Sequence, residues 1–260
     1  MHTQITAFNL GSGPVTLGDF YKLPPSHPLA KSIVETPTYS FCINLPDRAI
    51  MIDAGALPTG IHAEEFPMTE PTPPPLLDQM AQHGIPADRI TDVIITHTHW
   101  DHYNGLCHAI EGQLTPAFPN ARHIIHTADW HPEHFEKLEN ETLKIVDNHG
   151  LISLINGQLE IAKGVTIIPM PGETPGHQIV RVVIEGNHHY FCGDLFHDPI
   201  EFDDFAINVP WAEPVSMVAS KRATLSKAAE NRGLLYFSHI DGVFQVNKQA
   251  DTFEFEKLAD

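Results

Sequence analysis

Four side chains that bind transition metals stand close together in the segment Thr96-His97-Thr98-His99-Trp100-Asp101-His102. Imidazole and carboxylate groups are the ligands that suit zinc, manganese and iron. Alternate residues of an extended segment point the same way, so His97 and His99 can bind one ion. Asp101 and His102 follow and can reach a second ion nearby. The alternative is a polar loop in a chain with 18 histidines, but the spacing favours a metal site.

Three further candidate ligands follow in the chain, each past the end of an apolar run. They are His177, which follows residues 165–168 after a loop rich in proline and glycine, Asp194, which ends residues 190–194, and His239, which ends residues 234–239. Loops at the ends of buried strands can converge while the strands stay in the core. Singly, each has an ordinary alternative: a turn, a helix cap or a buried histidine. Their order and shared position favour ligands.

The elements that must position these residues are short strands interleaved with helices. The apolar run 93–95, directly before the first histidine, is typical of a buried strand. Hairpins are predicted at 39–45 with 49–53 and at 181–185 with 188–192, the second delivering Asp194. Other strands are predicted at 5–10, 15–20, 121–127, 151–155, 159–161, 165–168, 244–246 and 253–255, and helices at 76–83, 105–110, from 129 to 138 and at 214–231.

Two other segments have chemistry-bearing residues without a clear site. Residues 64–75 hold five prolines, so we expect a loop; Phe66 and Met68 lining a pocket is the alternative to a plain surface loop. No pattern of carboxylates at strand ends organises a second group of histidines, so we interpret it as surface or packing residues. Its members are His123, His126, His131 and His134.

Composition limits the class of protein. The chain has 260 residues and a net charge of -18, which argues against nucleic acid or an anionic membrane as partner. No composition shift marks a boundary, so we expect a single domain over residues 1–260. The three cysteines are scattered, which fits a reducing compartment. Without a signal-peptide pattern or an apolar run near ~20 residues, we predict a cytoplasmic protein.

The ordered ligands resemble the metallo-β-lactamase-fold superfamily, whose hallmark is His-x-His-x-Asp-His at the end of a strand. The resemblance spans residues 37–246 and is strongest at the ligands. It implies an α+β fold, the four-layer αββα sandwich, with the metals at one edge between two sheets. It also implies that Asp53, at the end of a strand, supports a metal-bound histidine, because an imidazole ligand needs its other nitrogen held. Turn chemistry before Gly55 is the alternative.

The resemblance implies a centre of two divalent ions. One ion would be bound by His97, His99 and His177, a second by Asp101, His102 and His239, and Asp194 would bridge them. Zinc is the expected metal, with manganese, iron and cobalt as alternatives. Two such ions can lower the pKa of a shared water toward neutrality. Asp101 is the predicted catalytic residue, because it can handle the proton of the leaving group.

Within the superfamily, the chain resembles the dinuclear hydrolase branch of N-acyl-homoserine lactonases and methyl parathion hydrolase. The motifs that carry this are Thr174-Pro175-Gly176-His177 and Gly193-Asp194-Leu195-Phe196-His197. β-Lactamases of the fold lack the bridging carboxylate, and its nucleases are disfavoured by the acidic charge. Lactonases of the branch carry a tyrosine soon after the bridging aspartate, where Phe196 and His197 stand here. We therefore expect a metal-dependent hydrolase of small esters or lactones, with organophosphates as an open alternative.

Other functions remain as alternatives. One is an iron-dependent persulfide dioxygenase, against which the full ligand set argues. Another is a glyoxalase II-like thioester hydrolase, whose basic anchor is not evident, although Lys248 and Lys257 stand near the C-terminus. A scaffold without catalysis is a third. The expected partner is a small-molecule ester or lactone, and a homodimer stays open. Phe196, His197 and Trp211 are candidates for the substrate wall, with core packing as the alternative.

Overall fold

The computed structural model describes residues 3–55, 68–131, 141–250 and 252–259. The contacts between residues divide the chain into two compact units. Unit 1 consists of Met1–Gly11 and Thr38–Asn156, and unit 2 of Ser12–Pro37 and Gly157–Asp260. Neither unit is one continuous stretch, because the segment Ser12–Pro37 interrupts unit 1 and belongs to unit 2. The prediction of a single domain over residues 1–260 stays a prediction.

A six-stranded sheet with the strand order β1-β2-β3-β4-β7-β8 is the framework of unit 1, and the ends of β1 and β2 that fall within Ser12–Pro37 are assigned to unit 2. The predicted hairpin of β2 and β3 is antiparallel, whereas β3, β4, β7 and β8 run parallel. Parallel strands are normally buried on both faces, and β3 is buried along its whole length. The bounds of these strands are β1 Gln4–Thr16, β2 Ile33–Asn44, β3 Ala49–Ile52, β4 Ile90–Ile94, β7 Arg122–His126 and β8 Ile152–Ile155.

Two helices of unit 1 bury their apolar side chains in one core cluster with this sheet. Leu76 and Met80 of α2 and Leu143 and Val146 of α4 are members of that cluster, together with Val93 of β4. The neighbouring α3 and η2 carry the chain away from β4, and β5 and β6 form a small separate sheet. The bounds are α2 Leu76–Gln82, η1 Ala87–Arg89, α3 Trp100–Tyr103, η2 Asn104–Leu106, β5 Cys107–Ile110, β6 Gln113–Pro116, η3 Thr127–Asp129 and α4 Glu141–Asn148.

A seven-stranded sheet is the framework of unit 2, with the order β15-β14-β13-β12-β11-β10-β9. All neighbours in it are antiparallel except β12 and β13. The second predicted hairpin, β11 with β12, is confirmed. The bounds are β9 Leu159–Ala162, β10 Val165–Pro169, β11 Gln178–Ile184, β12 Asn187–Phe191, β13 Leu234–Tyr236, β14 Val243–Gln249 and β15 Thr252–Ala259.

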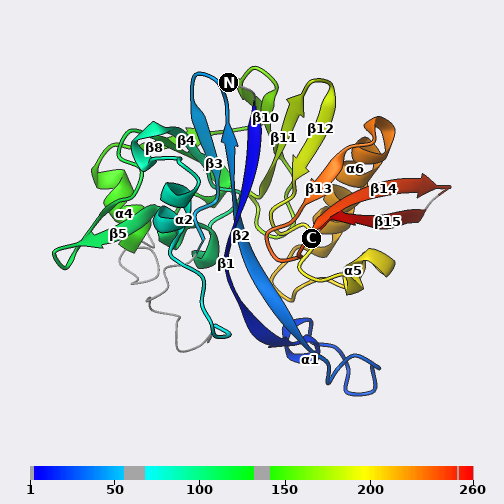
Figure 1. Ribbon diagram of the computed structural model, residues 1–260. Helices are drawn as coiled ribbons and strands as arrows, with labels where there is room; N and C mark the ends of the chain where they lie inside the picture. The colour runs from blue at the N-terminus through cyan, green and yellow to red at the C-terminus, as the bar shows by residue number, and fades with distance from the viewer. Residues whose placement is uncertain (1–2, 56–67, 132–140, 251, 260) are drawn as a thin grey trace. The chain divides into compact units, whose positions relative to one another are not determined.

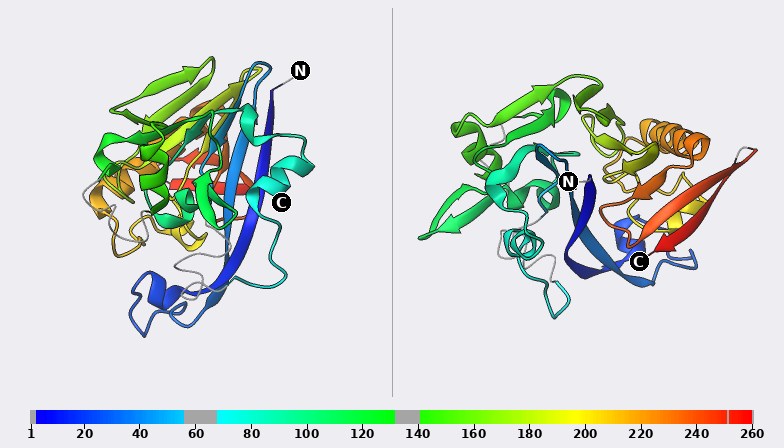
Figure 2. Two further views of the ribbon diagram at one scale, coloured as in Figure 1. Left: turned by 90° about the vertical axis from the view of Figure 1, so that its left-hand side faces the viewer. Right: turned by 45° about the horizontal axis from the view of Figure 1, so that its top comes forward.

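Helix α6 (Pro214–Asn231) packs on this second sheet against β12 and β14 (Figures 1 and 2). The predicted bounds of this helix are confirmed, and each end has a recognisable cap. Glu213 accepts hydrogen bonds from the first two free backbone N–H groups, with Pro214 at the first position of the helix. At the other end, Arg232 adopts a left-handed conformation that stops the helix.

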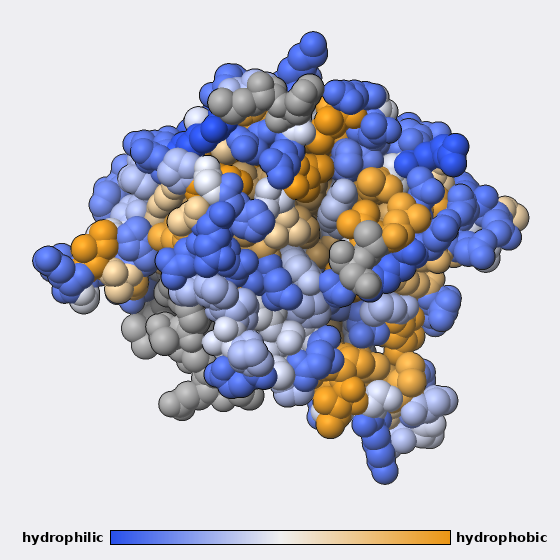
Figure 3. Space-filling model, viewed as in Figure 1, coloured by the Kyte–Doolittle hydropathy of each residue, from blue (hydrophilic) through white to orange (hydrophobic). Residues whose placement is uncertain are grey.

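The segment between β1 and β2 forms a small apolar cluster of its own in unit 2. Helix α1 (Leu17–Phe20) supplies Leu17, which packs with Tyr21 and Val209. Part of the segment stays on the surface, where Leu29 and Ile33 are exposed. Figure 3 shows hydrophobic side chains in the region that Figure 1 labels α1. This segment brings Tyr21 next to Ile200–Asp203, which is helix α5.

Several predicted elements are wrong in their details. Residues 5–10 and 15–20 are not two strands, because β1 passes through the glycine and proline of Gly11–Pro14 without a turn. Residues 105–110 are not a helix but the end of η2 and strand β5. Glu111 and Gly112 both have positive φ and close the β5–β6 hairpin. The same Glu-Gly geometry closes the β11–β12 hairpin, one residue before the predicted turn.

Some predictions fall partly outside the described residues. Of residues 64–75, the part from Met68 on forms a loop, as predicted, and Phe66 lies outside the described residues. The predicted helix from residue 129 to 138 also lies largely outside them, as does His134. Among the described helices, none combines the length and apolar composition needed to cross a membrane. The cytoplasmic location stays a prediction.

His123 is a packing residue, and we expect it to make stability depend on pH. Its side chain is fully buried on β7, and this burial lowers the pKa of the imidazole to about 4. The unfolded chain binds a proton near the ordinary value of about 6.5, so stability should fall as the pH drops from there toward 4. The loss should reach up to about 3 kcal/mol. Urea unfolding at pH 7 and 5 measures it.

His123→Leu is the matched variant for this prediction, because it removes the titrating group and keeps an apolar side chain at a buried position. Its stability should change less with pH than that of the wild type. Parallel curves for the two proteins would contradict the prediction.

Candidate metal centre

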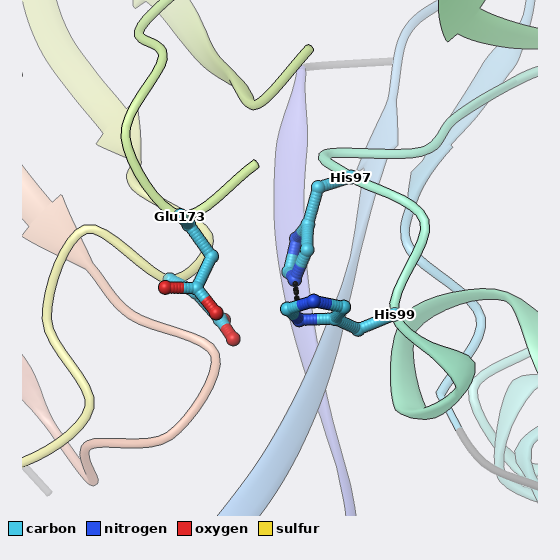
Figure 4. A group of neighbouring side chains, drawn as sticks. His97, His99 and Glu173 are labelled. Atoms are coloured by element: carbon cyan, nitrogen blue, oxygen red, sulfur yellow. Dashed lines mark hydrogen bonds between the residues drawn. The ribbon is translucent and has the colours of Figure 1, made fainter. Parts of the chain in front are cut away.

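The four residues of the first cluster lie together at the end of β4. Ile95 continues β4 into a loop, and α3 begins directly after His99. His97 Nε2 lies 2.9 Å from His99 Nδ1, as Figure 4 shows. The rings of His97 and His102 are 4.1 Å apart, and Asp101 Oδ2 lies 3.8 Å from His102 Nε2. The structure thus brings all four predicted ligands of unit 1 into one group.

Asp53 contacts both His102 and the start of the loop that carries the histidines, as the resemblance implies. It follows β3, is buried, and adopts a left-handed backbone conformation with φ of 56°. Its carboxylate accepts hydrogen bonds from the Thr96 N–H and hydroxyl, both at 2.8 Å. His102 Nδ1 lies 2.9 Å from the same carboxylate. Asp53 therefore fixes both the start of the histidine loop and the orientation of the His102 ring.

Gly105 lets the backbone after His102 lie against the Asp53 loop. Its N–H donates to Gly55 O at 2.8 Å, and a Cβ added at Gly105 would lie 2.1 Å from Ala54 O. We expect Gly105→Ala to destabilise the protein by about 1–3 kcal/mol and to weaken metal binding, because the obstructing atom is backbone. Urea unfolding and metal titration measure the two effects.

Gly112→Ala is the control for Gly105→Ala, since the space around its missing Cβ is open and only backbone strain is added. Equal metal affinities of the two variants would contradict a role of Gly105 at the site.

The three later ligands lie together in unit 2. Asp194 follows β12, and its N–H donates to His177 Nε2 at 3.1 Å. Asp194 Oδ2 lies 3.4 Å from His239 Nε2. All three side chains are buried. The structure thus also brings together the predicted ligands of unit 2, although His177 would have to exchange this hydrogen bond for a metal bond in order to act as a ligand.

The orientation of two imidazoles fits a metal ion. His102 Nδ1 faces Asp53, and His239 Nδ1 faces Pro37 O at 2.8 Å. Each ring therefore carries its proton on Nδ1 when neutral, and its Nε2 presents a lone pair. In both cases that lone pair is directed toward a carboxylate, Asp101 or Asp194. A neutral ring in this position presents its lone pair to another acceptor, and either a metal ion between the two or a proton on Nε2 removes the repulsion. The donor set in each unit therefore fits a divalent ion.

Sequence reasoning missed a carboxylate of this group, Glu173. It is buried, accepts a hydrogen bond from Trp211 Nε1, and lies with one oxygen within 4.8 Å of an Asp194 oxygen. Figure 4 shows its side chain extending from the loop that precedes β11. The available signal was its place in the same Pro- and Gly-rich loop as His177, four residues earlier. Glu173 adds a potential oxygen ligand to unit 2.

His197 lies in the middle of three carboxylates. Its Nε2 is 3.4 Å from Asp194 Oδ2 and 3.5 Å from Glu173 Oε1, and its Nδ1 is 3.3 Å from Glu201 Oε1. Burial alone would lower the pKa of this imidazole, but the carboxylates outweigh it and raise the pKa well above the ordinary value. His197 is therefore held by carboxylates at both nitrogens of its ring.

The candidates for a substrate wall occupy different environments. Phe196 is fully buried among the rings of Phe202, Phe205, Phe237 and Phe255, so of its two expected roles it has the one in core packing. His197 is also buried. Trp211 is half exposed and lies edge-on to Phe20. Phe20 contacts His197 as well. Of the three candidates, Phe196 and His197 are buried and Trp211 is at the surface.

Comparisons with known proteins agree with this picture. The family model described as Metallo-beta-lactamase superfamily matches residues 33–239. An N-acyl homoserine lactonase of Bacillus cereus is 23% identical over 166 residues, which are 59% of this chain and 61% of that protein. The chain thus matches less than two thirds of that relative's length.

Two solved structures resemble the chain over nearly its whole length. The first is AidC, described as a dizinc quorum-quenching lactonase in complex with a homoserine product; its TM-score is 0.76 at 17% identity, with 99% of this chain and 95% of that chain covered. The second is a probable metal-dependent hydrolase from Staphylococcus aureus, with a TM-score of 0.80 at 18% identity, covering 99% and 97%. These similarities show a shared fold and confirm the predicted α+β class.

Proposed function

Because the chain belongs to the metallo-β-lactamase superfamily, we propose that it is a metal-dependent hydrolase that cleaves small esters or lactones with two divalent ions. The family match extends from residue 33 to 239 and so includes every predicted ligand. The similarity to lactonases and to a dizinc enzyme supports zinc as the metal and a lactone or related ester as the substrate.

The observation that carries this proposal is the orientation of His102 and His239. In each ring Nδ1 faces an oxygen acceptor and Nε2 faces a carboxylate. This pattern is typical of imidazoles that are prepared to bind metal, in which the second nitrogen is held by a protein acceptor.

We assign the ligands as follows. His97, His99 and His177 would hold one ion, Asp101, His102 and His239 would hold the second, and Asp194 would be the carboxylate shared by both. Glu173 is a further carboxylate beside Asp194. When bound, two such ions lower the pKa of water and polarise the substrate oxygen.

The chain's own residues supply the rest of the chemistry. Asp101 is the most accessible of the assigned carboxylates, with 22% of its side chain exposed. It can therefore accept a proton and pass it to the leaving group. Trp211, half exposed and hydrogen-bonded to Glu173, is the side chain best placed to contact a bound substrate at the surface of unit 2.

The test is metal content per chain in protein purified without a chelator, followed by assays on lactones, aryl esters and phosphotriesters. We expect about two zinc or mixed divalent ions per chain and hydrolysis that a chelator abolishes and zinc restores. A single tightly bound iron with activity on persulfides would overturn the hydrolase assignment. Failure to hold any metal after reconstitution would remove the mechanism.

A further inference from the structure

Glu201 is a fully buried carboxylate. Its four hydrogen-bond contacts among the described residues are to residues that are not predicted metal ligands. Its Oε1 accepts from the Tyr21 hydroxyl at 2.6 Å and from the His197 N–H at 2.9 Å. The same oxygen lies 3.3 Å from His197 Nδ1, and Oε2 accepts from Lys221 Nζ at 2.6 Å. A carboxylate held in this way has a single orientation.

Lys221 completes this arrangement from helix α6. It is also fully buried, and its ammonium group donates to Glu201, to Asn208 Oδ1 at 2.8 Å and to Ile207 O at 3.3 Å. The desolvation cost of a buried ion pair is close to what its attraction returns, and apolar side chains often stabilise a core equally well. The stability of the core therefore does not explain why this pair is buried. A role in positioning a neighbouring side chain does explain it.

The element that this pair positions is the His197 ring. One ring nitrogen faces Glu201, and the other lies between Asp194 and Glu173. Phe20 packs edge-on at 5.5 Å, and the ring is nearly parallel to that of His239 at 6.0 Å. Rotation of the imidazole would break contacts at both nitrogens. A continuous line of contacts thus leads from Lys221 through Glu201 and His197 to Asp194.

We propose that the buried group Tyr21–Glu201–Lys221 positions His197 and thereby fixes the Asp194 carboxylate in the orientation that lets it serve two ions. This inference rests on the function proposed above. Asp194 follows the end of strand β12, and its carboxylate is buried beside two imidazole rings. Within unit 2, His197 and His239 both contact the same oxygen, Oδ2. Tyr21, Glu201 and Lys221 are therefore positioning residues.

The experiment compares two variants that each remove one buried phenol hydroxyl. Tyr21→Phe removes the bond to Glu201. Tyr190→Phe removes the bond between Tyr190 and Asn231, on β12 and α6, which has no contact with Glu201. Glu201→Gln is the stronger variant, because it removes the charge that pairs with Lys221. Zinc or cobalt is titrated into metal-depleted protein, and the affinities for both ions, kcat, KM and the unfolding temperature are measured.

We expect Tyr21→Phe to weaken binding of at least one ion on the order of tenfold and Glu201→Gln toward 100-fold. In Tyr21→Phe, kcat should fall with little change in KM. Tyr190→Phe should lose a similar amount of thermal stability and keep wild-type metal affinity. If Tyr21→Phe binds both ions as tightly as Tyr190→Phe, the buried group only stabilises the core and the inference is wrong. That result leaves the proposed function intact, because the wild type still binds two ions. If the wild type itself binds no ions, the proposed function is contradicted.

Discussion

Asp194→Ala is expected to abolish turnover and to leave a folded protein that binds less metal. The Asp194 side chain contacts both His197 and His239, and the backbone N–H of the same residue donates to His177. Removal of a group that only holds a ligand in place costs roughly 10- to 100-fold in metal affinity. Loss of an assigned shared ligand should exceed that, because both ions lose an oxygen.

Elemental analysis, steady-state kinetics and circular dichroism test this expectation together. Asp204→Ala is the matched control, since it makes the same chemical change at an exposed carboxylate of unit 2 that accepts a hydrogen bond from the Ala206 N–H. This control should keep its metal and its activity. Wild-type activity in Asp194→Ala would refute the two-ion mechanism.

Asp53→Ala should reduce both metal affinity and the stability of the metal-free protein. The substitution leaves the buried Thr96 N–H and hydroxyl without their acceptor, which costs about 1–3 kcal/mol. It also frees the His102 ring, so metal affinity should fall roughly 10- to 100-fold. Urea unfolding in the presence of a chelator measures the first effect, and metal titration measures the second.

Asp53→Asn separates charge from geometry. Asparagine tolerates the left-handed backbone at this position and keeps one acceptor oxygen for Thr96. Its stability loss should therefore be smaller than that of the alanine variant, while its metal affinity should still fall, because the neutral amide holds the His102 ring less firmly. Undiminished metal affinity in both variants would show that Asp53 only shapes the turn.

The candidate ligands could be found in the sequence because their signal is local or repeated. His97, His99, Asp101 and His102 form a dense cluster in the sequence. His177, Asp194 and His239 each lie a few residues after an apolar run that forms a strand. Strand ends are where a sheet places side chains that must converge. Helix α6 was predictable for a similar reason, since an acidic residue and a proline mark its start.

The supporting residues could not be predicted, because their contacts depend on tertiary structure alone. Tyr21 and Glu201 are 180 positions apart, and nothing in the local sequence of either indicates the other. Lys221 lies in an amphipathic pattern in which a lysine is ordinarily a solvated residue, yet it is fully buried. Its burial follows from the presence of Glu201 and Asn208, which only the folded chain brings to it.

The errors in secondary structure also have physical causes. Gly11 and Gly13 suggested a turn, but a strand that bends tolerates glycine at positions of close approach, and a Cβ at Gly11 would overlap Met68 Cε. The dipeptide Asn156-Gly157 separates the predicted strands 151–155 and 159–161, and Asn-Gly is typical of a hairpin turn between neighbouring strands. It lies instead where the chain passes from β8 in one sheet to β9 in another. A local turn signal does not state which strands will pair.

The division of unit 2 into two separate stretches has a consequence for synthesis on the ribosome. Tyr21 emerges 180 residues before Glu201, which at roughly 5–20 residues per second is a delay of roughly 10 to 40 s. During that time Leu17 and Tyr21 lack the partners that bury them in the finished protein. A nascent chain that stops within unit 2 would keep this apolar segment exposed as a target for chaperones. Any chimera that exchanges unit 2 between relatives must therefore carry Ser12–Pro37 together with Gly157–Asp260.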